Sequence, residues 1–241
     1  EKGEVMLEIR NLTKRYKGGK VAVDNLSLTV EAGDIFAFIG HNGAGKSTTI
    51  KSVVGILEFD SGDIFIDGHS VKDEPMACKK DLAYIPDNPD IYDHLTGIQY
   101  LNFIGDVFGV DSATRTAKID DYATRFDIKK NLGDMVGSYS HGMKQKLVLI
   151  SALMHSPKLL VMDEPFVGLD PKASFEVKNI MRELCKEGAA IFFSTHVLEV
   201  AEKLCNKVAI IKDGKLVVCG DTETVVGSGS LESVFLKSEE V

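Results

Sequence analysis

A glycine-rich run that ends in lysine, serine and threonine is the clearest sign of chemistry in this chain. Residues 40–48 read GHNGAGKST, which matches the pattern G-x-x-x-x-G-K-[ST]. Glycines allow the backbone to fold around an anion with its N–H groups pointing inward, and the start of a following helix adds roughly half a positive charge. Lys46 would reach the β- and γ-phosphates of a nucleotide, and the Ser47 hydroxyl would bind Mg²⁺. The residues expected to contact the nucleotide here are Asn42, Gly43, Ala44, Gly45, Lys46, Ser47 and Thr48.

An acidic pair follows a second apolar run. Asp163 and Glu164 come directly after residues 159–162, which read LLVM. Ligands of an open parallel sheet bind at the carboxyl ends of its strands, so we expect both carboxylates beside the phosphate-binding loop. Asp163 would hold Mg²⁺ directly or through water, and Glu164 would polarise a water molecule against the γ-phosphate. The simpler alternative is a pair of solvated acids at a strand end, which a phosphate-binding loop at the same sheet edge disfavours.

Two further side chains are candidates for the same site. His196 follows the apolar run 190–193 and a Ser-Thr pair, so it can reach the γ-phosphate and orient Glu164. Tyr16 lies in a turn-rich stretch, where its ring could stack on a purine with Val23 as an apolar neighbour. Each also has an ordinary structural interpretation, namely a satisfied histidine at a strand end and a tyrosine that packs there.

A serine predicts a second anion site elsewhere. Ser140 precedes a run in which Met143, Leu147 and Ile150 recur at helical spacing, so it is expected to cap that helix. Its hydroxyl and the N–H groups that follow could bind an anion. Without such a ligand, the run would simply be a core helix.

The elements that must position these residues alternate between strands and helices. Alternating apolar and polar residues predict antiparallel strands at 5–10, 26–30 and 64–66. Between residues 87 and 139 the pattern becomes helical, beginning with a capping box at Thr96 and Gln99. Asp170 and Pro171 are expected to start another helix. Unbroken or nearly unbroken apolar runs, typical of buried parallel strands, occupy residues 34–39, 159–162, 190–193 and 208–211.

Composition narrows the class of protein. The chain has 241 residues, of which 44% are hydrophobic, so it can bury a sizeable core. A formal net charge of −8 argues against nucleic acid as the main partner. No apolar run approaches the ~18 residues of a membrane span, and the charged start predicts no signal peptide. The 4 cysteines are scattered without metal-ligand spacing.

Three further motifs complete an ordered set. Residues 139–145, YSHGMKQ, resemble the signature LSGGQ of ATP-binding cassette (ABC) transporter nucleotide-binding domains. Residues 168–170, GLD, resemble the D-loop of that family, and residues 194–196, STH, resemble its switch region. With the phosphate-binding loop and the acidic pair, these motifs occur in the family's order and cover nearly the whole chain.

The resemblance implies a fold and a division of the chain. We expect an α/β fold in which a P-loop NTPase core with a mainly parallel sheet carries an antiparallel β-subdomain and an inserted α-helical subdomain. Residues 1–241 would form a single ABC ATPase domain. Within it, residues 1–86 and 140–241 would form the core with the antiparallel β-subdomain, and residues 87–139 the helical subdomain.

The resemblance also implies an activity. The chain would be the ATP-binding and ATP-hydrolysing subunit of a membrane transporter, with Tyr16 stacked on adenine and Lys46, Glu164 and His196 acting in catalysis. Two cassettes, identical or different, would pair head to tail around two ATP molecules, and Asp170 would link the two active sites. The residues that would contact the partner's ATP are Ser140, His141, Gly142 and Met143.

Partners and location follow from the same resemblance. Transmembrane permease subunits would dock in a groove around residues 87–100 and hold the chain at the cytoplasmic face of the cell membrane. The runs YSHGMKQKL and LESVFLK are similar to cassettes of bacterial exporters, which favours export.

Other interpretations of the function are a soluble cassette ATPase of translation or DNA repair, or a weakly hydrolysing nucleotide switch. Single copies of each motif and the retention of Glu164 and His196 favour the transporter.

Three positions depart from the family pattern. Asp87 stands where the family usually has a glutamine that contacts Mg²⁺ and the attacking water, and it would supply a shorter, charged oxygen ligand. His141 replaces the first glycine of the signature pair, and Met143 replaces its terminal glutamine. A side chain at position 141 would crowd or supplement the phosphate contact, which would either slow turnover or make pairing with a non-identical cassette productive.

Overall fold

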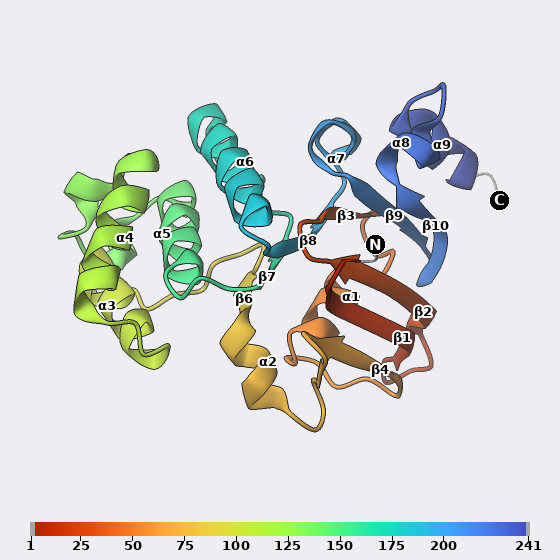
Figure 1. Cartoon of the computed structure of the whole chain (residues 1–241), viewed down its shortest axis with the longest axis horizontal. Coiled ribbons are helices and arrows are strands. Elements are labelled where there is room, and N and C mark those ends of the chain that lie inside the picture. The colour runs from red at the N-terminus through yellow and green to blue at the C-terminus, as the bar shows by residue number, and fades with distance from the viewer. Residues whose placement is uncertain (1–2, 240–241) are drawn as a thin grey trace.

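The computed structural model describes residues 3–239 and contains a mainly parallel sheet at its centre (Figure 1). The strand order is β10-β9-β3-β8-β7-β6, and only β10 pairs antiparallel to its neighbour. Every residue of β3, β7 and β8 is buried, which explains their unbroken apolar runs. The strands are β3 (Ile35–Ile39), β6 (Leu82–Ile85), β7 (Leu159–Asp163), β8 (Ala190–Thr195), β9 (Lys207–Lys212) and β10 (Lys215–Asp221).

A second sheet is antiparallel, as predicted, and has the order β2-β1-β4-β5. Its strands are β1 (Val5–Arg15), β2 (Val21–Glu31), β4 (Ser61–Ile66) and β5 (His69–Ser70). Apolar side chains of this sheet share one core with Phe36, Phe38 and Phe192 of the large sheet and with Ile50 of helix α1 (Lys46–Val53). The antiparallel sheet therefore covers one face of the large sheet, with α1 between them.

Helices cover the opposite face. Figure 1 shows α3, α4 and α5 grouped at one end of the molecule, away from β1, β2 and β4 at the other. Helix α5, which lies outside residues 87–139, contacts both α3 and α4. Residues 87–139 stay a proposed helical subdomain. The helices are α2 (Pro75–Asp81), α3 (Gly97–Val107), α4 (Ser112–Arg125), α5 (His141–Leu153), α6 (Pro171–Lys186), α7 (Leu198–Leu204), α8 (Thr222–Val226) and α9 (Leu231–Glu239), with 3₁₀ turns η1 (Lys129–Asn131) and η2 (Val136–Ser138).

Local capping chemistry fixes several helix starts. Thr96 and Gln99 form the predicted capping box at the start of α3. Asp170 accepts the N–H of Ala173 at 2.8 Å and begins α6 with Pro171 in its first turn. Between residues 3 and 239, no helix combines the length and the apolar composition needed to cross a membrane.

A buried carboxylate ties the start of β3 to β9. Asp34 is 4% exposed, and its two oxygens accept hydrogen bonds from the Asn206 side chain at 2.8 Å and the Glu31 N–H at 2.7 Å. The Lys207 ammonium lies 3.0 Å from the same carboxylate. Without Asp34, the Asn206 amide and the Glu31 N–H would lose their acceptor, while Lys207 would keep its pair with Glu31 at 2.8 Å.

Replacement of Asp34 by alanine is expected to lower the free energy of unfolding by about 3 kcal/mol, because it leaves two hydrogen-bond donors without an acceptor and removes one of the two carboxylates that pair with Lys207. Urea denaturation followed by circular dichroism measures the change. Asp24→Ala is the matched control, since its pair with Lys215 is 3.5 Å long and exposed, and its effect should stay below about 1 kcal/mol. Equal effects of the two variants would contradict this account of the Asp34 network.

Candidate nucleotide site

The phosphate-binding loop joins β3 to α1 and requires glycine at two places. Gly45 has a φ of 113°, and a β-carbon there would lie 2.4 Å from the carbonyl oxygen of Ala22. A β-carbon on Gly40 would lie 2.7 Å from the carbonyl oxygen of Ile211. Close backbone packing therefore excludes side chains at both positions. The Lys46 ammonium donates to the carbonyls of Gly40 at 2.5 Å and His41 at 3.3 Å.

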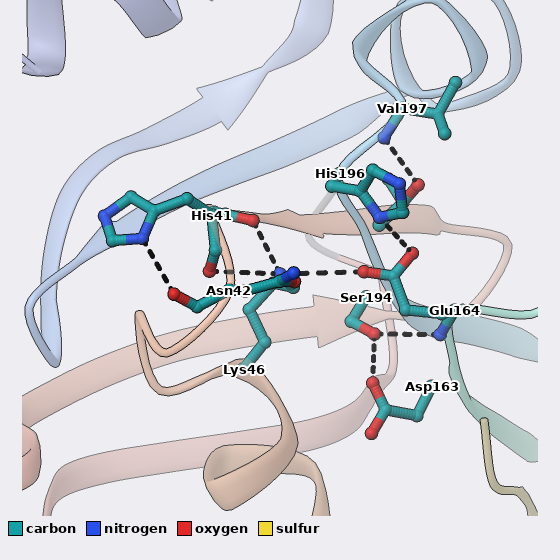
Figure 2. A network of polar contacts seen from close by, with 10 residues as sticks. His41, Asn42, Lys46, Asp163, Glu164, Ser194, His196 and Val197 are labelled. Carbon is teal, nitrogen blue, oxygen red and sulfur yellow. Dashed lines mark hydrogen bonds and ion pairs between the residues drawn. The ribbon is translucent and has the colours of Figure 1, made fainter. Parts of the chain in front are cut away.

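The predicted catalytic residues meet at one point of the sheet edge. One carboxylate oxygen of Glu164 lies 3.6 Å from the Lys46 ammonium, and the other lies 3.0 Å from Nδ1 of His196 (Figure 2). β7 and β8 are parallel neighbours, so the residues that follow them emerge side by side. Glu164 therefore stands between a cation and an imidazole at the carboxyl ends of the strands.

Glu164 has an unusual backbone conformation. Its φ is +48°, a region that residues other than glycine seldom occupy. The Glu164 N–H donates to the Ser194 hydroxyl at 3.0 Å, and that hydroxyl donates to one oxygen of Asp163 at 2.5 Å. Ser194 thus connects the two acidic residues, a function that the sequence analysis did not assign. No sequence pattern identifies this role, because the position of Ser194 opposite Asp163 depends on the register between β7 and β8.

Asp163 has the properties of a cation ligand. Its side chain is 1% exposed, and its second carboxylate oxygen is buried without a hydrogen-bond partner. A buried, unpaired carboxylate oxygen is costly unless a cation or proton approaches it. Ser47 and Asp87 line the same cavity as Asp163, so this donor set fits a hard cation such as Mg²⁺.

The negative charge of these acids also acts on Tyr84 of β6. Burial, together with the carboxylates of Asp163 and Asp87, raises the pKa of Tyr84 to about 12. Tyr84 therefore stays neutral throughout the physiological range. Asp87 itself is exposed, and one of its oxygens accepts the N–H of Asn88 at 2.9 Å.

A cavity of about 260 Å³ extends from Glu164 to the antiparallel sheet. Tyr16 stands at its rim with 43% of its surface exposed, and its hydroxyl lies 3.2 Å from that of Thr48. Val23 does not lie in the cavity, contrary to our expectation, because its side chain is fully buried in the core. Its neighbour Ala22 lines the cavity instead, together with Lys20, which the sequence analysis missed.

The predicted second anion site lies outside this cavity. Ser140 caps α5 and accepts the N–H of Met143 at 3.2 Å. None of the residues 140–143 lines the cavity that contains Lys46. Asp170 is also separate, and its carboxylate pairs with Lys146 at 2.7 Å. The hydrogen bond from Lys146, followed by that from the Ala173 N–H, lowers the pKa of Asp170.

A family model and known proteins that match this chain all point to the same family. Residues 23–167 match the family model described as ABC transporter. An uncharacterized ABC transporter ATP-binding protein, YhcH of Bacillus subtilis strain 168, is 38% identical over 216 residues, which cover 89% of this chain and 69% of that protein. The Nod factor export ATP-binding protein I of Burkholderia lata is 32% identical over 222 residues, or 92% of this chain and 73% of that protein.

A solved structure extends the likeness to three dimensions. The structure described as an ATP binding subunit of an ABC transporter superposes with a TM-score of 0.92 at 31% sequence identity. The alignment covers 97% of this chain and 99% of that one. The antiparallel sheet, the central sheet and the helical group therefore all have counterparts in a known cassette.

Proposed function

Because the chain belongs to the ABC transporter family, as one of its ATP-binding ATPase subunits, we propose that its site at Lys46, Glu164 and His196 hydrolyses ATP to drive export across a membrane. The observation that carries the proposal is the position of Glu164, with one carboxylate oxygen 3.6 Å from Lys46 and the other 3.0 Å from His196. This arrangement supports a role for Glu164 as a base between two groups that would contact the same phosphate.

Each of the three side chains has a separate task. Lys46 binds the β- and γ-phosphate oxygens, where its charge offsets the charge that builds up as the phosphoryl group transfers. Glu164 accepts a proton from the water whose oxygen attacks the γ-phosphorus, while the bond to the ADP oxygen breaks. His196 holds the Glu164 carboxylate in position and contacts the γ-phosphate.

Asp163, Ser47 and Asp87 are the proposed ligands of Mg²⁺. The unpaired oxygen of Asp163 supports the assignment, and the Ser47 hydroxyl and Asp87 carboxylate line the same cavity. A bound magnesium ion would neutralise charge on the β- and γ-phosphates. Ser194 keeps Asp163 in place through its 2.5 Å hydrogen bond.

Tyr16 is the proposed platform for the adenine ring. Tyr16→Ala is expected to raise the Kd for ATP about tenfold, because stacking of one base on an aromatic ring is worth about 1–3 kcal/mol. Tyr16→Phe keeps the ring and loses only the contact with Thr48, so it serves as the control and should stay within about twofold of the parent. Titration with a fluorescent ATP analogue measures both constants. An unchanged Kd for Tyr16→Ala would remove Tyr16 from the site.

The Ser140 turn is proposed to complete the site of a second copy. The same chain carries both the Lys46 cavity and the capped start of α5, which supports pairing of two identical cassettes. Val167 and Val197, close in sequence to Glu164 and His196, are 47% and 39% exposed, and a second copy would cover them. Light scattering of Glu164→Gln with ATP should give twice the 26.3 kDa mass of one chain. A constant monomer mass at saturating ATP would contradict self-pairing.

An apolar groove is the proposed docking surface for a membrane subunit. It has a volume of about 1110 Å³, and its walls come from α2, α3 and the segment around Pro86 and Ile91. Met76 and Val107 line it with 76% and 63% of their surfaces exposed. A short helix from a transmembrane permease chain is the proposed occupant, and it would hold this chain at the cytoplasmic face of the membrane.

Export is the proposed direction of transport. A relative at 32% identity is described as an export ATP-binding protein, for Nod factor, and this supports the proposal. Family membership as a transporter subunit disfavours the translation, repair and switch interpretations.

A further inference from the structure

The first two turns of α5 hold the segment that follows Glu164. Residues 165–170 connect Glu164 to α6, and Asp170 caps that helix. Three side chains of α5 contact this segment, one near its start, one near its middle and one at its end. Gln145 donates from its amide to the carbonyl of Pro165 at 3.1 Å. Lys146 pairs with Asp170 at 2.7 Å. His141 packs against Gly168 between these two anchors.

The ring of His141, an exposed residue, lies beside Gly168. A β-carbon on Gly168 would lie 2.6 Å from Cδ2 and 3.0 Å from Nε2 of the His141 ring. Gly142 is equally close on the other side, since a β-carbon there would lie 3.0 Å from the Gly168 carbonyl oxygen. Gly168 also has a φ of +81°. The imidazole ring therefore occupies the space that any side chain at position 168 would need.

The path of residues 165–170 bears directly on Glu164. Gln145 holds Pro165, the next residue in the chain, and the Glu164 carbonyl accepts the N–H of Val167 at 3.2 Å. Glu164 keeps its strained φ of +48° only while its surroundings fix it. A looser segment would let the backbone relax and would turn the carboxylate away from His196.

We propose that His141 is a positioning residue for ATP hydrolysis, whose ring, packed on Gly168, fixes residues 165–170 and through them the carboxylate of Glu164. The inference rests on the role proposed above for Glu164. His141 stands where the family signature has glycine, and this role would explain the presence of a side chain there. It also links the Ser140 turn, proposed to contact the partner's ATP, to the hydrolytic site of its own chain.

A double-mutant cycle of His141→Gly and Gly168→Ala tests the contact. His141→Gly should lower kcat about fivefold and change the KM for ATP less than twofold, because the ring acts on residues 165–170 of its own chain rather than on the partner's ATP. Gly168→Ala alone should lower kcat about 20-fold, since the new methyl group displaces the ring and also strains the backbone. In the His141→Gly background the same substitution should cost only about threefold, because only the backbone strain remains. Equal penalties in both backgrounds would overturn the proposal.

Two further variants separate packing from direct contact with nucleotide. His141→Phe keeps a ring of similar shape and should recover most of the kcat lost in His141→Gly. Failure of this rescue, with a raised KM, would overturn the proposal in favour of an imidazole that binds ATP. Lys144→Ala is the control from the same helical turn, because its ammonium contacts Asp93 at 2.7 Å rather than residues 165–170, and its kcat should match the parent.

Epistasis with Glu164 distinguishes this inference from the proposed function. In a Glu164→Gln background, His141→Gly should cause no further loss of turnover. Parental turnover by Glu164→Gln alone would overturn the role of Glu164 and with it this inference. An inactive Glu164→Gln together with additive penalties in the cycle would overturn only the role of His141.

Discussion

Glu164→Gln is expected to lower kcat for ATP hydrolysis by about 10²- to 10⁴-fold, since general base catalysis contributes on that order. The amide has nearly the shape of the carboxylate but cannot accept a proton from the attacking water. The variant should keep its affinity for ATP, because Lys46 and Tyr16 remain. Phosphate release at saturating ATP measures the turnover, and titration with a fluorescent analogue measures binding.

The control for this prediction is Glu199→Gln. Glu199 is 76% exposed and pairs with Lys203 on α7, so its loss should leave kcat unchanged. If Glu164→Gln retained more than half of the parental turnover, the role of Glu164 as base would be wrong. Loss of ATP binding in the same variant would show that the substitution had damaged the cavity rather than the chemistry.

Lys46→Met is expected to lower kcat/KM by about 10³-fold, because removal of one preorganised charged donor to the reacting group costs on that order. Methionine fills the space of the lysine stem, which is needed because Lys46 is only 6% exposed. It cannot supply the ammonium that stands 3.6 Å from Glu164. Initial rates of phosphate release at low ATP concentration give the ratio directly.

Lys51→Met serves as the matched control, since Lys51 lies in the last turn of the same helix with its side chain exposed. Its kcat/KM should equal that of the parent. A Lys46→Met variant with parental kcat/KM would mean that the loop at residues 40–48 does not hold the nucleotide phosphates.

Features set by local chemistry could be predicted from the sequence. The loop at residues 40–48, the caps at Ser140 and Asp170 and the buried strands depend on neighbours in the chain, and the structure places all of them as expected. β1 and β2 extend beyond the predicted 5–10 and 26–30, because irregular pairing interrupts the alternation on which the prediction relied.

Features set by distant neighbours could not be predicted. The register between β1 and β2 shifts near Lys14 and Val23, so the neighbouring residues Ala22 and Val23 are both buried. Of these two residues, Ala22 lines the cavity and Val23 does not. The +48° φ of Glu164 has no sequence signal, since glutamate rarely adopts it. The packing of His141 on Gly168 joins two segments that only the assembled fold brings together.

Affinity purification of the tagged chain from its native membranes in mild detergent would show whether this ATPase works on a membrane partner. Mass spectrometry should find a polytopic membrane protein in amounts comparable to this chain. Met76→Asp, which places a charge in the apolar groove, should reduce that recovery at least tenfold with turnover of the isolated chain unchanged. Recovery of ribosomes or soluble assemblies without any membrane protein would contradict the account.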